Sequence, residues 1–200
     1  MLNFIYLASQ SPRRRQLLEQ LGVRHELLLP DNSEDAEALE AVLKNEAPAA
    51  YVKRVTGLKL DAAVARLARR NLPPAPILCS DTTVAKGRTI YGKPDDAADA
   101  QRMLGELSGS THRVLTAVAV QQGAQRFEAQ STSRVTFEAM TPAQIQAYVA
   151  TGEPMGKAGA YAIQGKVAMH ITRINGSYSG IMGLPLWETA SLLQAAGLKI

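Results

Sequence analysis

The sequence predicts an α/β protein, in which short buried strands alternate with amphipathic helices. Residues 4–8 and 77–80 are short apolar runs, each followed by polar or turn-forming residues, as in buried strands. Residues 48–70 instead repeat apolar side chains with helical spacing, after a proline suited to a helix start. Residues 111–137 form two long extended segments around Gly123, which indicates a β-hairpin. Strands and helices in this alternation favour a sheet flanked by helices.

The length and composition are those of a folded globular chain. Its 200 residues are 46% hydrophobic, which allows one ordinary domain or two small lobes that share a core. No internal repeat, low-complexity tract or convincing linker divides the sequence. We therefore expect a single domain over residues 1–200.

Charge and cysteine content narrow the class of protein. The net charge of +4 suits a small polyanionic ligand but is too slight to indicate nucleic-acid binding. The single cysteine, Cys79, excludes an internal disulfide framework and a cysteine-based zinc site. No apolar run reaches membrane-spanning length, and the first residues lack a signal-peptide pattern. We expect a soluble, cytoplasmic protein that binds neither nucleic acid nor membrane.

Three arginines stand at the predicted start of the first helix. Ser11 is the predicted N-cap and Pro12 the first helical residue, so Arg13, Arg14 and Arg15 lie where the helix dipole is already positive. Each arginine there costs about 0.3–1 kcal/mol unless an anion compensates it. The stretch is either a phosphate site or a set of solvated arginines, and it alone does not decide between them.

An acidic loop follows the next predicted strand. It carries five carboxylates, and a solvated loop explains most of them, although one near a phosphate site could hold Mg²⁺. These residues are Asp31, Glu34, Asp35, Glu37 and Glu40.

Three further residues are candidates for chemistry. Asp81 follows the buried run 77–80, at the predicted carboxyl end of a strand, where α/β proteins collect ligands, although a turn aspartate fits equally well. Lys59 shares a helical stripe with apolar residues; such lysines usually extend to solvent, and the alternative is a ligand contact. Lys93 lies between Gly92 and Pro94 on a constrained loop.

The later part of the sequence predicts an ordered binding loop and three further elements. Residues 151–165 are rich in glycine but too apolar for a flexible linker. We expect a strand over residues 167–174, a turn over 175–180 and a last helix over 187–196. His112, at a strand start, is interpreted as a structural residue.

These pieces together resemble the Maf family of nucleotide pyrophosphatases, collinearly over residues 4–193. The motifs that carry the resemblance are Ser9-x-Ser11-Pro12-Arg13-Arg14, Lys59, Asp81-Thr82-x-Val84, Gly92-Lys93-Pro94, Ser108-Gly109-x-Thr111-His112-x-Val114-x-Thr116, Gly152-Glu153-Pro154, Lys157-Ala158-Gly159-Ala160-Tyr161-x-Ile163-Gln164-Gly165, Gly176-Ser177-Tyr178 and Gly183-Leu184-Pro185-Leu186. Gly156 departs from the pattern, because the family often has an acidic residue there.

The resemblance implies an enzyme that uses a divalent cation, Mg²⁺ or Mn²⁺, to cleave a nucleoside triphosphate into the monophosphate and pyrophosphate. It implies a homodimer and a fold akin to inosine triphosphatases, with a mixed, twisted sheet, flanking helices and a central cleft. The loop at 157–165 resembles the branch that acts on dTTP, UTP and base-modified analogues. The alternatives are a 7-methyl-GTP pyrophosphatase and a non-catalytic regulator of septum formation.

By this resemblance, Asp81 falls on the proton acceptor of the family, and Arg13, Thr82 and Gln164 fall on its specificity positions. Whether Asp81 acts as a base or as a metal ligand stays open, with Glu34 as a second metal carboxylate. A glutamine amide both donates and accepts, as pyrimidine recognition requires. The predicted phosphate-binding residues are Ser9, Arg13, Arg14, Lys59 and Lys93.

Overall fold

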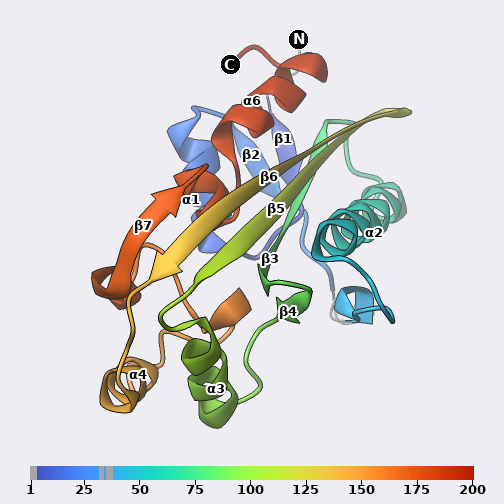
Figure 1. Ribbon diagram of the computed structural model, residues 1–200. Helices are drawn as coiled ribbons and strands as arrows, with labels where there is room; N and C mark the ends of the chain where they lie inside the picture. The colour runs from blue at the N-terminus through green and yellow to red at the C-terminus, as the bar shows by residue number, and fades with distance from the viewer. Residues whose placement is uncertain (1–3, 32–33, 35–37) are drawn as a thin grey trace.

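The computed structural model describes residues 4–31, 34 and 38–200, and it confirms the α/β class and the mixed sheet. Seven strands form one sheet in the order β2-β1-β3-β5-β6-β7, with β4 paired to β3 (Figure 1). The strands are β1 (Ile5–Leu7), β2 (His25–Leu27), β3 (Ile77–Lys86), β4 (Thr89–Tyr91), β5 (Thr111–Gln122), β6 (Gln125–Phe137) and β7 (Ile171–Asn175).

The sheet has a parallel part and an antiparallel part. Strand β1 runs parallel to both β2 and β3, whereas β3, β5, β6 and β7 are antiparallel to their neighbours. The β5–β6 hairpin predicted around Gly123 is confirmed, with a register from Thr111↔Thr136 to Gln122↔Gln125. Gly123 has a φ of 56°, a left-handed conformation that glycine adopts without strain.

Helices cover both faces and one end of the sheet. Helix α2 packs on β3 and β5, α6 packs on β5 and β6, and α3 packs against α4 at the end of the sheet away from the chain termini (Figure 1). The α-helices are α1 (Pro12–Gln20), α2 (Pro48–Arg69), α3 (Ala97–Leu107), α4 (Pro142–Val149), α5 (Tyr178–Met182) and α6 (Leu186–Ala195). The 3-10 helices are η1 (Ala38–Glu40), η2 (Ala158–Ala160) and η3 (Lys166–His170).

Side chains alternate along β3, so this one strand contributes to the hydrophobic cores on both faces of the sheet. Ile77 and Cys79 pack with Leu60 of α2 on one face. Leu78 points to the opposite face and packs with Leu18 of α1 and other apolar side chains. Burial on both faces accounts for the unbroken apolar run that precedes Asp81. The strand therefore delivers successive polar residues to opposite sides of the sheet.

The first helix begins as the sequence predicts. Ser11 is the N-cap of α1 and accepts a hydrogen bond from the Arg14 backbone N–H, and Pro12 is the first helical residue. Leu17 and Leu18 of this helix are buried, whereas Arg15 is exposed. The arginine pair that precedes Arg15 is therefore held by a rigid helix start.

Three predictions about secondary structure are wrong. Asp81 does not end its strand, because β3 continues to Lys86 and pairs with β5 from Ile77 to Ala85. The strand expected over 167–174 is instead η3 followed by β7, and the turn expected over 175–180 contains the start of α5. The described helices include none long and apolar enough to cross a membrane.

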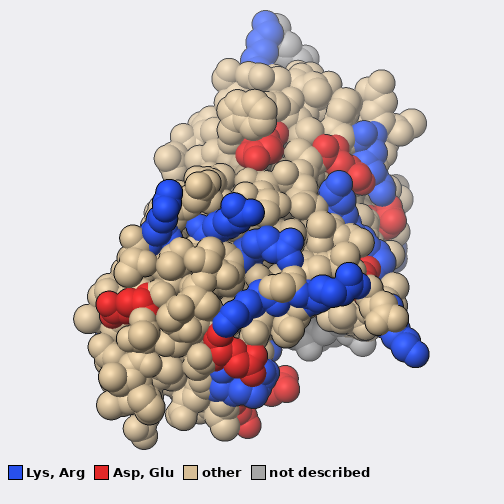
Figure 2. Space-filling model, in the orientation of Figure 1, with Lys and Arg blue, Asp and Glu red and all other residues tan. Residues whose placement is uncertain are grey.

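Lysine and arginine side chains are unevenly distributed over the surface. On the face drawn in Figure 2 they gather mainly in a band across its middle, with acidic side chains beside it.

Candidate active site

A cleft of about 920 Å³ lies where α1, α2, β3 and the loop after α4 meet. It confirms the central cleft that the resemblance implies. Most of the predicted site residues line it, and these are Ser9, Arg13, Arg14, Glu34, Lys59, Asp81, Thr82 and Lys93. Gln164 is exposed and does not line this cleft, although Tyr161 and Ile163 of the same loop do.

The cleft exists because one edge of β3 is open. Strand β1 pairs with β3 only as far as Leu78, and β4 pairs with the same strand from Val84 onward. Within the described residues no strand covers the edge between these two points. The backbone carbonyl of Leu78 accepts from Ala8 at this edge, so by alternation the N–H and C=O of Thr82 point to the cleft as well.

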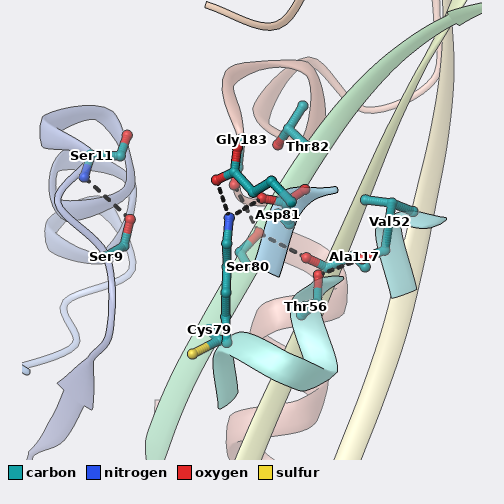
Figure 3. Close-up of polar contacts among 12 residues, drawn as sticks. Ser9, Ser11, Val52, Thr56, Cys79, Ser80, Asp81, Thr82, Ala117 and Gly183 are labelled. Atoms are coloured by element: carbon teal, nitrogen blue, oxygen red, sulfur yellow. Dashed lines mark hydrogen bonds and ion pairs between the residues drawn. The ribbon is translucent and has the colours of Figure 1, made fainter. Parts of the chain in front are cut away.

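Side-chain alternation then splits the site between the two faces of the sheet. The Asp81 side chain points toward α2, and the Thr82 side chain points toward α5. Figure 3 shows Ser80, Asp81 and Thr82 with Gly183 beside them and the Ser9–Ser11 turn of α1 across from them. A ligand lying along the open edge can therefore contact both sets of side chains.

On the α2 side, two lysines and two carboxylates form a continuous network. Lys59 Nζ lies 2.6 Å from Asp81 Oδ1 and 2.7 Å from Glu40 Oε1. Lys93 Nζ lies 3.0 Å from the other carboxylate oxygen of Glu40. Tyr51 holds η1 in place by donating to the Glu40 carbonyl at 2.9 Å. Lys59 thus points into the cleft and does not extend to solvent.

Two positive and two negative side chains balance each other in this network. Burial acts to lower the pKa of Lys59, but the Asp81 charge and the hydrogen bonds to Asp81 and Glu40 raise it overall. Burial likewise acts to raise the pKa of Glu40, and the hydrogen bonds from Lys59 and Lys93 lower it overall. Both Lys59 and Glu40 therefore keep their charges near neutral pH.

Arg13 and Arg14 form the wall of the cleft at α1. Arg14 Nε donates to the Gly183 carbonyl at 2.8 Å, and its Nη1 donates to Ser9 Oγ at 3.1 Å. Arg13 Nε is 3.4 Å from the Met182 carbonyl. Burial lowers the pKa of both guanidinium groups, although arginine remains charged at any physiological pH. Both guanidinium groups are thus bonded at the cleft wall near a helix N-terminus, an arrangement that favours the phosphate-site alternative over three solvated arginines.

On the α5 side, three oxygen atoms form a chain of hydrogen bonds. Thr82 Oγ1 lies 3.0 Å from Thr116 Oγ1, which in turn donates to the Gly180 carbonyl at 2.7 Å. Next to this chain, Ser80 Oγ is within 2.8 Å of the Ala117 carbonyl (Figure 3). No role is predicted for Thr116 from the sequence, where it appears only as part of a motif that carries the family resemblance.

Glu34 lies on the cleft but is held by arginines. Its carboxylate contacts Arg66 Nη2 at 2.5 Å and Arg69 Nη2 at 2.6 Å. The hydrogen bond from Arg66 is the main cause that lowers the pKa of Glu34 to about 2. Glu34 is therefore already neutralised, and Glu40 is the acidic residue that shares a lysine with Asp81.

The acidic loop gave no local signal to separate Glu40 from the other carboxylates. Of the other three, Asp31 pairs with Arg69 and Arg70, and Asp35 and Glu37 lie outside the described residues. In the described part of the chain, no group of three or more His, Cys, Asp and Glu side chains is arranged to hold a metal ion.

Comparisons with known proteins identify relatives of this chain. A family model described as Maf-like protein matches residues 4–196. The chain is 73% identical to a dTTP/UTP pyrophosphatase of a Polaromonas species, over 99% of this chain and 98% of that protein. It is 70% identical to a dTTP/UTP pyrophosphatase of Albidiferax ferrireducens over the full length of both. Among solved structures it is similar to the Staphylococcus aureus Ham1 protein, with a TM-score of 0.44 and 12% identity over 96% of each chain. A family model that covers residues 4–196, together with relatives of this similarity, establishes that the chain belongs to the Maf family.

Proposed function

We propose that this protein hydrolyses the pyrimidine nucleoside triphosphates dTTP and UTP, and their base-modified analogues, to the monophosphate and pyrophosphate. Water adds to the α-phosphorus, the bond to the bridging oxygen breaks, and pyrophosphate leaves with that oxygen. The observation that carries the proposal is the Asp81–Lys59 pair, which lies on an open strand edge opposite two half-buried arginines. The relatives named dTTP/UTP pyrophosphatase, at 70% and 73% identity, support the same reaction.

Asp81 is the residue we assign to the water. Lys59 donates a hydrogen bond to one carboxylate oxygen of Asp81, and within the described residues the other oxygen has no hydrogen-bond partner. That second oxygen can accept a proton from a water or orient it. Lys59 fixes the carboxylate and compensates its charge, which would otherwise repel a triphosphate.

The cations around Asp81 suit the charge that the substrate brings. Arg13 and Arg14 present guanidinium groups that can hold phosphate oxygens in pairs, and Ser9 adds a hydroxyl next to Arg14. Lys59 and Lys93 add point charges from the other wall. We assign these five residues to the triphosphate, where they stabilise negative charge that develops on the leaving pyrophosphate.

The carboxylates of the site fit a divalent cation. Mg²⁺ is commonly held by one or two carboxylates together with substrate phosphates and water. Asp81 and Glu40 meet at Lys59 and offer such a pair, whereas Glu34 is occupied by Arg66 and Arg69. We therefore assign Asp81 and Glu40 to Mg²⁺ or Mn²⁺. When bound, the ion would neutralise phosphate charge as a Lewis acid.

Recognition of the base is assigned to Thr82 first. Thr82 lines the cleft, with its hydroxyl and its backbone groups at the open strand edge. Gln164 retains the role that the family resemblance implies, from an exposed position on the loop. The same resemblance underlies our further proposal that residues 1–200 act as one domain in a cytoplasmic homodimer.

The proposed function is tested by pyrophosphate release from a panel of nucleotides. The purified protein is incubated with Mg²⁺ or Mn²⁺ and with dTTP, UTP, CTP, GTP or 7-methyl-GTP, and pyrophosphate is measured separately from orthophosphate. We expect dTTP and UTP to have the highest kcat/KM. A preference for 7-methyl-GTP would contradict the pyrimidine assignment, and no release from any nucleotide would contradict the enzymatic one.

A further inference from the structure

The hydrogen-bonding role of the Thr82 hydroxyl group in the cleft is fixed by its neighbours. Thr116 Oγ1 lies 2.7 Å from the carbonyl oxygen of Gly180, which can only accept, so the single hydroxyl hydrogen of Thr116 points there. Thr82 Oγ1 lies 3.0 Å from Thr116 Oγ1. Because Thr116 has no second hydrogen to give, Thr82 must be the donor in this pair. The Thr82 oxygen is then left with lone pairs only for anything that enters the cleft.

The arrangement that fixes this polarity is rigid. Thr116 is 1% exposed and lies directly opposite Thr82 in the β3–β5 register. The Ile181 N–H, in the same peptide as the Gly180 carbonyl, donates to the Ser177 carbonyl at 3.0 Å, and Ser177 Oγ caps α5 by accepting from the Gly180 N–H at 3.0 Å. A Cβ on Gly180 would lie 3.3 Å from Ser131 Oγ, so the helix is packed closely on the sheet. No rotation of Thr116 is needed for the hydrogen-bond chain to form.

A hydrogen-bond acceptor at the Thr82 hydroxyl can distinguish the pyrimidine bases by whether their N3 carries a hydrogen atom. Uracil and thymine carry N3–H, which is a donor, whereas cytosine has a bare ring nitrogen at the same position. We propose that Thr116 is a positioning residue that keeps Thr82 as an acceptor and thereby selects bases with N3–H over cytosine. This inference rests on the proposed function, in which the cleft holds a pyrimidine triphosphate. It adds the residue that sets which bases are accepted.

The inference is tested by substituting Thr116 and measuring the ratio of kcat/KM for UTP to that for CTP. In Thr116→Val the shape is kept but Thr82 loses its acceptor, so its hydrogen can turn toward the N3 of cytosine. We expect the UTP/CTP ratio to fall by about tenfold or more, as for a hydrogen bond of ordinary strength. Thr116→Ser keeps the hydroxyl and should keep the wild-type ratio. Thr116→Ala makes the same prediction as Thr116→Val if the valine variant does not fold.

A double-mutant cycle separates positioning from a general structural effect. Thr82→Val should itself lower the UTP/CTP ratio, and adding Thr116→Val to it should change the ratio no further. An unchanged ratio in folded Thr116→Val, or an equal fall in the Thr82→Val background, would overturn the inference. The wild-type protein is measured first: if it releases no pyrophosphate from UTP, dTTP or CTP, the proposed function fails, and the inference fails with it.

Discussion

At the scale of single residues, Lys59 connects the two carboxylates of the site. It comes from the middle of α2, shares a face with buried Val52 and Val55, and still reaches two carboxylates. Its side chain is only 20% exposed, so the two ion pairs are partly shielded from water. Removing this ammonium would leave Asp81 and Glu40 facing the triphosphate with less compensation.

Replacing Lys59 therefore tests whether the network serves the reaction. We expect Lys59→Met to lower kcat/KM for UTP by about 100-fold or more, because it removes a cation from the phosphates and releases Asp81. Lys53→Met is the matched control, since Lys53 is exposed on the same helix. Steady-state kinetics and thermal unfolding would be measured for both. Equal effects of the two substitutions, or full activity in Lys59→Met, would argue against this role.

Local chemistry predicts some of these residues and not others. The N-cap Ser11 and the arginines after it follow from rules that span a few residues, so the sequence is sufficient for them. The choice between Glu34 and Glu40 depends on where Arg66, Lys59 and Lys93 lie, and these residues come from other elements. No pattern within the acidic loop contains that information.

At the scale of elements, the loop after α4 depends on glycines with particular surroundings. Gly159 has a φ of 68°, and a Cβ there would lie 2.8 Å from Val84 Cγ1. Its N–H donates to the Gly92 carbonyl at 2.9 Å, which ties this loop to the residue before Lys93. This contact supports the prediction of an ordered loop from its glycine-rich, apolar sequence.

A pair of alanine substitutions separates backbone strain from close packing in this loop. Gly156 also has a positive φ, of 71°, but a Cβ there would meet nothing within 4 Å. We expect Gly156→Ala to destabilise the protein by about 1 kcal/mol, and Gly159→Ala by about 2–4 kcal/mol with a loss of activity, because Val84 and the Lys93 loop must shift. Denaturant unfolding and UTP kinetics would measure this. The expectation fails if the two variants are equally stable.

The wrong prediction for Asp81 also belongs to this scale. A polar residue after an apolar run looks like the end of a strand, because sequence patterns report burial more directly than pairing. In the structure β5 pairs with β3 from Ile77 to Ala85, well past the end of the apolar run. The strand is therefore extended by a partner that is 28–34 residues away in sequence, in a β5–β6 hairpin that the sequence does predict.

At the scale of the whole molecule, the cleft is assembled from distant parts of the chain. Arg13 and Arg14 bind the carbonyls of Met182 and Gly183, each 169 residues away in sequence. The sequence predicts the strands and helices that carry these groups, but the contacts between them follow from the sheet order. The family resemblance supplied what local reasoning could not, namely that the dispersed motifs share one site.

The most direct test of the account is hydrolysis of UTP in ¹⁸O-labelled water, with the products analysed by mass spectrometry. Attack at the α-phosphorus predicts one labelled oxygen in UMP and none in pyrophosphate, and a rate about 10²–10⁴ lower in Asp81→Asn. Label in the pyrophosphate, or UDP with labelled orthophosphate as products, would contradict the proposed reaction. A wild-type rate in Asp81→Asn would contradict the assignment of the water to Asp81.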